Sequence, residues 1–281
     1  MGDVARAVEH LEEAVDSFRE EDYAGSPLRP GHMVHGLLAR VLAERGFPER
    51  AEAEIQRAID VIERSDSPQD RCGGWAVCAF DYAYLRDARS AARCIERAYA
   101  LDLADRPGYA VHIAEVCSAW ARAMLGEPEP AVAELRQAID AVTASGSTFG
   151  LRRSLGMLAE AELLAGRAAE GLATLDKAIA ANPEDRILLP ELLRLRGELR
   201  AACGAEPAAV ESDLREAVAL AREMGARLSE LRAATSLARQ LAHRGRATEG
   251  RELLAPLYAA FTEGFGARDL VEAKALLDEF G

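Results

Sequence analysis

The chain has 281 residues, of which 49% are hydrophobic and 29% charged, a composition typical of a globular protein rather than a disordered or fibrous one. Its formal net charge of −13 argues against a nucleic acid or an anionic membrane surface as the main partner, because both need clustered positive charge. Only Lys177 and Lys274 are lysines, so nearly all the positive charge is arginine. No apolar run approaches the ~18 residues of a membrane span, and the first residues form no apolar signal segment, so we expect a cytoplasmic protein.

The pattern of apolar residues is helical from one end of the chain to the other. Alanine and leucine, which lose little side-chain freedom in a helix, are abundant, and strand signals are absent. The fold class is therefore predicted to be all-α. The expected helices are 3–20, 32–45, 48–64, 69–85, 88–101, 108–125, 128–144, 149–165, 167–181, 185–203, 207–224, 227–244, 247–262 and 268–279.

A repeat of about 40 residues runs through these helices. Its clearest marker is a ladder of mostly small residues at positions 58, 98, 138, 178, 217 and 257. Three residues before each of these positions stands isoleucine or leucine, and seven before stands alanine, glycine or valine. These three offsets fall on one face of a helix, and the small residues let a neighbouring helix approach closely. Glycines at 46, 126, 166 and 245 separate this helix from a preceding one, which also carries a small residue (Ala39, Ala119, Ala159 and Ala238).

This helix pair resembles the tetratricopeptide repeat. The fourth copy fits best, from Ala159 through Gly166, Gly171, Leu175 and Ala178. A period of 40 is longer than the ~34 residues usual for that family, and the second copy has Arg86 where the turn glycine is expected. The resemblance implies one domain, 1–281, folded as a right-handed solenoid of about six helix pairs. The repeats are 32–64, 69–101, 108–144, 149–181, 185–224 and 227–262, with a capping helix at 268–279.

The first expected helix, 3–20, has the pattern of a second helix without its first. Ala7, Leu11 and Ala14 reproduce the offsets of −7, −3 and 0. Two interpretations stay open: a natural half-repeat at the start of the array, or a segment of a longer protein, which we favour.

The stretch from about residue 150 to residue 281 resembles the repeat region of large bacterial signalling proteins. In those proteins, an adenylate cyclase or a transcriptional output domain is joined to a predicted ATPase and then to a tetratricopeptide array. The residues that carry the resemblance are 192–199, 230–234, 236–239, 253–258, 261–265 and 272–277. The resemblance implies a sensory or docking arm: a non-catalytic protein- or peptide-binding scaffold of a bacterial regulator.

In a tetratricopeptide array the first helix of each pair lines the concave face, where a partner would bind. Carried over from the small residue of each repeat, the groove positions are Phe80, Tyr84, Trp120, Met124, Arg153, Glu160, Arg194, Glu198, Arg232 and Arg239. The N-terminal half would then be apolar and aromatic, and the C-terminal half rich in arginine with glutamates. Such a surface suits a peptide with an apolar end and an acidic end.

Each part of this interpretation has a structural alternative. Phe80 and Trp120 also suit the core between repeats, and the arginines and glutamates also suit pairing with one another. Two other functions stay open: a small-molecule sensor that uses the aromatic half, or self-association through an open end of the array, giving a homo-oligomer.

The sequence predicts no catalytic or metal site and no cofactor. There is no phosphate-binding glycine loop, nucleophile elbow or zinc helix motif. His32 and His35 lie three residues apart, but no third ligand is spaced beside them, so we expect a solvent-exposed pair. The five cysteines, at 72, 78, 94, 117 and 203, are expected to be buried and reduced.

Overall fold

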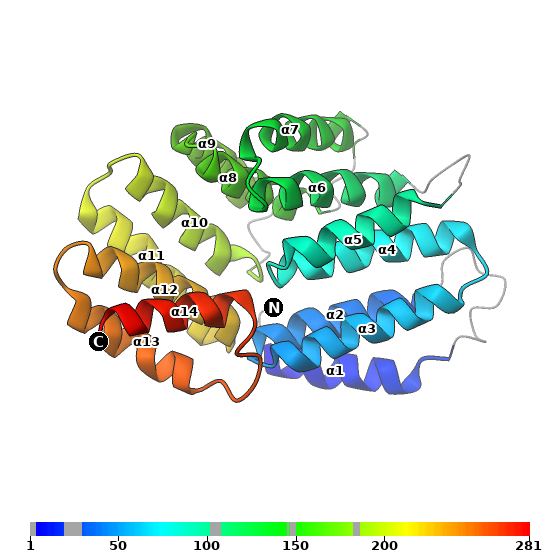
Figure 1. The fold of residues 1–281 in the computed structure, drawn as a ribbon, viewed down its shortest axis with the longest axis horizontal. Coiled ribbons are helices and arrows are strands. Elements are labelled where there is room, and N and C mark those ends of the chain that lie inside the picture. Colours follow the sequence, from blue (N-terminus) through cyan, green and yellow to red (C-terminus); the bar gives the residue numbers. More distant parts are fainter. Residues whose placement is uncertain (1–3, 20–29, 102–107, 145, 147–149, 182–185) are drawn as a thin grey trace. The chain divides into compact units, whose positions relative to one another are not determined.

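A computed structural model describes residues 4–19, 30–101, 108–144, 146, 150–181 and 186–281. These residues form fourteen α-helices and no strand (Figure 1). The helices are α1 (Val4–Ser17), α2 (Gly31–Glu44), α3 (Pro48–Arg64), α4 (Pro68–Tyr84), α5 (Ala88–Tyr99), α6 (Gly108–Met124), α7 (Pro128–Ala144), α8 (Leu151–Leu164), α9 (Ala168–Ala181), α10 (Leu189–Ala202), α11 (Pro207–Met224), α12 (Arg227–Ala242), α13 (Ala247–Ala259) and α14 (Arg268–Glu279). The predicted all-α fold class is confirmed, and the predicted helix bounds differ from these by a few residues.

The chain divides into two compact units. The N-terminal unit contains Ala5–Ala43 and Pro48–Gly150, and the C-terminal unit contains Leu151–Gly281 with short pieces of the N-terminal sequence. A single domain over 1–281 stays a prediction.

Within each unit the helices alternate between two roles. We call the even-numbered helices from α2 to α14 the A helices, and the odd-numbered ones from α3 to α13 the B helices. In the N-terminal unit, α4 packs on α5, on α6 and on α3, and α6 packs on α7. In the C-terminal unit, each A helix from α10 to α14 contacts the A helix before it as well as the preceding B helix. Because α14 contacts α12 and α13 in this way, it occupies the position of the first helix of a further pair.

The small-residue face of each B helix is the buried one. Along the ladder, Ala58, Ala98, Ala138, Ala178 and Ala217 are at most 3% exposed, and the isoleucines and leucines three residues earlier are buried in every repeat. At Gly171 an added Cβ would lie 2.6 Å from the side chain of Leu199, so the A helix α10 leaves no room for a methyl group there. Close approach of helices therefore leaves room for no side chain at Gly171, and it suits the small, buried alanines of the ladder.

The turns between A and B helices need a left-handed backbone. Gly46, Gly126, Gly166 and Gly245 all have φ between +73° and +110°. Arg86, at the corresponding turn of the second repeat, has φ of +58° and is the one non-glycine residue with positive φ among the residues described. The second repeat thus has arginine in place of glycine but keeps the same left-handed turn.

We expect Gly166→Ala to lower the free energy of unfolding by about 1 kcal/mol, because a Cβ is disfavoured at positive φ. An added Cβ at Gly166 meets no atom within 4 Å, so the loss measures backbone strain alone. Gly108→Ala, which also meets no atom but lies at ordinary φ at the start of α6, is the matched control. Urea unfolding followed by circular dichroism measures both. Equal stability of the two variants would contradict the assignment of strain to the turn.

Candidate functional site

All ten predicted groove residues lie on A helices. Phe80 and Tyr84 belong to α4, Trp120 and Met124 to α6, and the remaining six to α8, α10 and α12. The helices are therefore those expected, but the side chains differ in how much surface they offer. Whether any of them contacts a partner stays a prediction.

In the N-terminal unit the predicted aromatic surface is mostly interior. Trp120 is 1% exposed and Tyr84 is 6% exposed, whereas Phe80 and Met124 are half-buried. A side chain as buried as Trp120 serves the packing between helices, which was the structural alternative. Phe80 and Met124 are the two members of this group that keep accessible surface.

In the C-terminal unit, Arg194 is buried inside a polar network. Its guanidinium lies 2.6 Å from Glu191 Oε1 and 2.8 Å from Glu198 Oε2, and Glu198 accepts a hydrogen bond of 2.6 Å from Ser236 Oγ on α12. Burial disfavours the charged guanidinium, but Glu191 and Glu198 outweigh that effect and raise the pKa of Arg194. Arg194 and Glu198 thus satisfy one another within the protein.

Arg232 forms a second internal pair. Its Nη2 atom lies 2.7 Å from Asp269 Oδ2, and its Nε donates a hydrogen bond of 2.8 Å to the same oxygen. Both side chains are at most 4% exposed, so this ion pair is buried where α12 meets α14. Of the other predicted residues, Arg153 and Glu160 are half-buried and have interaction partners. Arg239 is half-buried with no partner among the residues that the structure describes.

A polar pair between the first two repeats is not among the residues predicted from the sequence. Arg40 on α2 and Asp81 on α4 approach to 2.7 Å between Nε and Oδ1, and the Arg40 guanidinium carbon lies 5.4 Å from the centre of the Phe80 ring. A signal for Arg40 was present: it follows Ala39, as Phe80 follows Ala79.

The expectation of a solvent-exposed histidine pair is wrong. His32 is 1% exposed, and the side chain of His35 is 15% exposed with Nδ1 2.8 Å from Glu54 Oε2 on α3. Neighbouring helices cover α2 on the side that carries both rings. Neither nitrogen of His32 has a hydrogen-bond partner among the residues described, and burial lowers its pKa although Asp70 opposes the shift.

Cysteine and metal chemistry add no site among the described residues. Cys72, Cys78, Cys94 and Cys117 are buried free thiols, as predicted, but Cys203 is exposed because it follows the end of α10. No group of three or more histidine, cysteine or acidic side chains within this part of the chain has an arrangement that holds a metal ion. None of the described helices combines the length and the apolar character that a membrane span needs.

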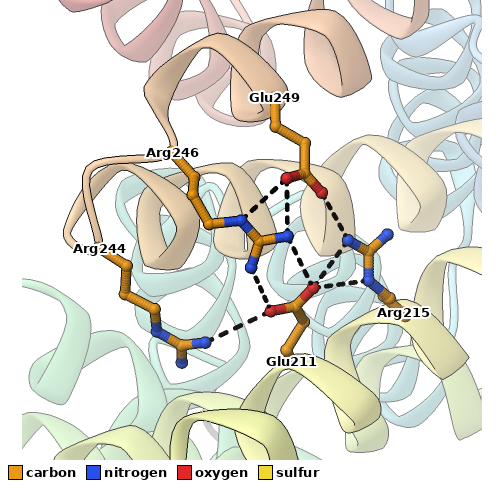
Figure 2. A network of polar contacts seen from close by, with 5 residues as sticks. All are labelled: Glu211, Arg215, Arg244, Arg246 and Glu249. Atoms are coloured by element: carbon orange, nitrogen blue, oxygen red, sulfur yellow. Dashed lines mark hydrogen bonds and ion pairs between the residues drawn. The ribbon is translucent and has the colours of Figure 1, made fainter.

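A cluster of five charged residues joins two successive repeats (Figure 2). Glu211 on α11 accepts hydrogen bonds from Arg215 and Arg246 at 2.7 Å each, and Glu249 on α13 accepts one from each of the same two arginines. Arg244 lies 3.4 Å from Glu211. The hydrogen bonds from Arg246 and, to a lesser extent, Arg215 lower the pKa of Glu211. Three arginines share two glutamates in this cluster, which links the B helices α11 and α13 through the turn that precedes α13.

The helix pairs, their small buried faces and their left-handed turns define the class: a tetratricopeptide-like helical solenoid. No protein-family model and no curated protein matches the sequence. Solved structures match the fold. The chain is similar to Rap protein complexed with Competence and Sporulation Factor, with a TM-score of 0.68 and 12% identity over 99% of this chain and 87% of that one. It is also similar to NprR in complex with its cognate peptide NprX, with a TM-score of 0.61 and 11% identity over 98% of this chain and 76% of that one.

A third structure is a signal-transduction ATPase with numerous domains and a tetratricopeptide-repeat sensor, from Pyrococcus horikoshii. It matches with a TM-score of 0.49 and 14% identity, over 99% of this chain and 41% of that one. A likeness at that level carries no argument about this protein.

We expect Arg194→Met to lower the free energy of unfolding by about 3 kcal/mol, because it removes the buried guanidinium that pairs with the partly buried carboxylates of Glu191 and Glu198. Arg239→Met is the matched control on the next A helix and is expected to change stability by less than about 0.5 kcal/mol. Urea unfolding measures the free energy of unfolding of both variants. An Arg194→Met protein as stable as the control would show that the network does not stabilise the fold.

We expect His32→Leu to stabilise the protein by about 1 kcal/mol at pH 7, since it removes two buried nitrogens without partners. The lowered pKa of His32 means that the unfolded chain binds its proton first, so acid destabilises the wild type as the pH falls below about 6.5. That part of the pH dependence is expected to vanish in His32→Leu. Unfolding free energies measured between pH 5 and 8 test it, and an unchanged slope would contradict it.

Proposed function

We propose that the protein is a non-catalytic scaffold that binds a peptide segment on the A-helix side of its repeats. The observation that carries the proposal is the fold, because the structural matches to Rap and NprR cover 99% and 98% of this chain. Both solved structures are complexes, Rap with Competence and Sporulation Factor and NprR with its cognate peptide. The same arrangement of helices supports an extended peptide as the ligand here.

The described side chains favour a peptide over a rigid globular partner. Among the predicted groove residues, Phe80, Met124 and Arg239 each keep part of their surface, and so does Arg40 on α2. Isolated aromatic and arginine anchors suit side chains of a flexible segment, which supplies its own contacts between them.

We further infer that peptide binding has a regulatory purpose. The resemblance of the C-terminal repeats to those of bacterial cyclase, ATPase and transcriptional regulators supports a sensory or docking arm. The absence of a predicted catalytic motif in the sequence and the negative net charge are consistent with a cytoplasmic protein-binding role.

The proposal is tested with random peptides of five to fifteen residues displayed on phage and selected on the folded chain. Selected peptides are synthesised and their affinities measured by calorimetry. We expect saturable binding of one peptide per chain, and we expect Phe80→Ala to weaken it at least tenfold by removing an aromatic anchor.

Tyr99→Ala is the matched control, because Tyr99 is an aromatic residue, 43% exposed, at the end of the B helix α5. Its affinity should equal that of the wild type. Loss of binding in Tyr99→Ala with retention in Phe80→Ala would place the ligand on the B helices and contradict the proposal. Circular dichroism shows that both variants are folded before they are compared.

A further inference from the structure

The N-terminal unit holds an arginine, Arg40, whose side chain is oriented by two contacts. The Nε atom of Arg40 lies 2.7 Å from Asp81 Oδ1, and its guanidinium stacks at 5.4 Å over Phe80. The Asp81 side chain is completely buried, whereas that of Arg40 is 26% exposed. The buried carboxylate therefore holds the inner edge of a guanidinium whose outer part reaches the surface.

Asp81 itself is held in place by the shape of α2. An added Cβ at Gly36 would lie 2.3 Å from Asp81 Oδ2, so the carboxylate sits directly against the α2 backbone at that residue. Gly36 and Arg40 are one helical turn apart on the same face. One oxygen of Asp81 thus contacts the Gly36 turn and the other meets Arg40, which leaves the carboxylate little freedom to turn.

The outer edge of Arg40 is unused. No described residue accepts a hydrogen bond from Nη1 or Nη2 of Arg40. The two terminal amino groups of a guanidinium lie side by side at a spacing that matches the two oxygens of a carboxylate. An arginine that is stacked, tethered at Nε and open at Nη is preorganised to receive such a group.

Stability does not account for this arrangement. A buried ion pair generally contributes less than apolar side chains of the same volume, because two charges must be removed from water. Burial raises the pKa of Asp81, although Arg40 offsets part of the effect, so the site keeps a carboxylate where the ionised form is disfavoured. A carboxylate at this position makes sense as a support for Arg40.

We propose that Arg40, positioned by Asp81 and flanked by the Phe80 ring, binds a carboxylate of the peptide ligand. The carboxylate is either an aspartate or glutamate side chain or the peptide's C-terminus. This rests on the proposed function and assigns its acid-recognising contact. The sequence alone predicts that contact on arginines of the later repeats, but Arg194 and Arg232 form internal ion pairs.

A second stacked arginine provides a matched control. Arg97 on α5 lies 5.5 Å from the centre of the Trp75 ring, and its side chain is 65% exposed. Its ion pair is a loose one of 3.7 Å to Glu63, which is itself half exposed. Arg97 thus stacks on an aromatic ring but lacks a buried carboxylate partner. A comparison of Arg40 with Arg97 therefore shows whether the buried partner matters beyond the stacking.

The first experiment detects ligand binding at the Arg40 side chain directly and needs no knowledge of the natural peptide. Arginine side-chain ¹⁵N–¹H resonances are followed by NMR during titration with two probes: N-acetyl-phenylalanine, which mimics a peptide C-terminus, and N-acetyl-glutamate α-methylamide, which mimics an acidic side chain. We expect one or both to shift the Arg40 resonances saturably, and the stronger probe identifies the source of the carboxylate. N-acetyl-phenylalanine amide, which is neutral, should shift them at least tenfold less at equal concentration.

Three results would overturn the proposal. The first is the absence of a saturable shift at Arg40 with either carboxylate probe. The second is an equal saturable shift at Arg97, which would make the effect one of exposed arginines in general. The third is a shift with inorganic phosphate at a tenfold lower concentration than with the carboxylates, which would change the class of ligand.

The second experiment uses the peptides selected on phage and separates this inference from the proposed function. Arg40→Lys keeps a positive charge beside Asp81 but removes the planar fork, and we expect it to bind a selected peptide at least tenfold more weakly. Arg97→Lys should bind as the wild type does. The peptide's carboxylate can be removed by amidation or by glutamine in place of glutamate. This change should weaken binding to the wild type by the same factor, and it should not weaken binding to Arg40→Lys any further.

Asp81→Asn and Gly36→Ala test the positioning of Arg40. Both leave the guanidinium in place but disturb its tether, so the carboxylate-dependent part of the affinity should fall while binding of the amidated peptide stays unchanged. Thermal melting establishes that each variant is folded. Equally strong peptide binding by the wild type and Arg40→Lys would refute the role of Arg40 but not the scaffold function. Failure to select any peptide would refute the scaffold function, and the NMR titration would then be the test of Arg40.

Discussion

The structure depends on how closely its helices approach one another. At Gly171, Gly197 and Gly250 an added methyl group would lie within 2.6–3.0 Å of the neighbouring helix, and the alanines of the ladder are buried almost completely. Helices at this distance bury their backbones as well as their side chains, so each pair sits in a fixed register. Larger residues at these positions would separate the A helices from the B helices along the repeat.

Close packing also explains why so many polar groups lie inside the A-helix layer. An A helix is covered by its own B helix, by the preceding B helix and by neighbouring A helices, so few of its positions reach water. Charged residues there must be neutralised from an adjacent helix or turn, as Asp269 does for Arg232. Arg40 follows this rule only through its Nε atom, which faces Asp81, and Arg239 departs from it because no described residue pairs with its side chain.

The sequence alone was sufficient for the fold and insufficient for the site. Helical periodicity, the 40-residue ladder and the turn glycines are local properties, and each is visible in a single repeat. Exposure of an A-helix residue is set by three neighbouring helices at once, which is why Trp120 was placed on a surface and His32 in solvent. The pairing of Arg232 with Asp269 links residues 37 positions apart, and no spacing rule within one helix predicts it.

The scarcity of lysine has a consequence for covalent regulation. Lys177 and Lys274 are both exposed, and both belong to the C-terminal unit. Acetylation, methylation or ubiquitin attachment on a side-chain amine can therefore act on that unit alone. The Arg40 environment, built with a guanidinium that such chemistry does not touch, keeps its charge whatever the state of the amines.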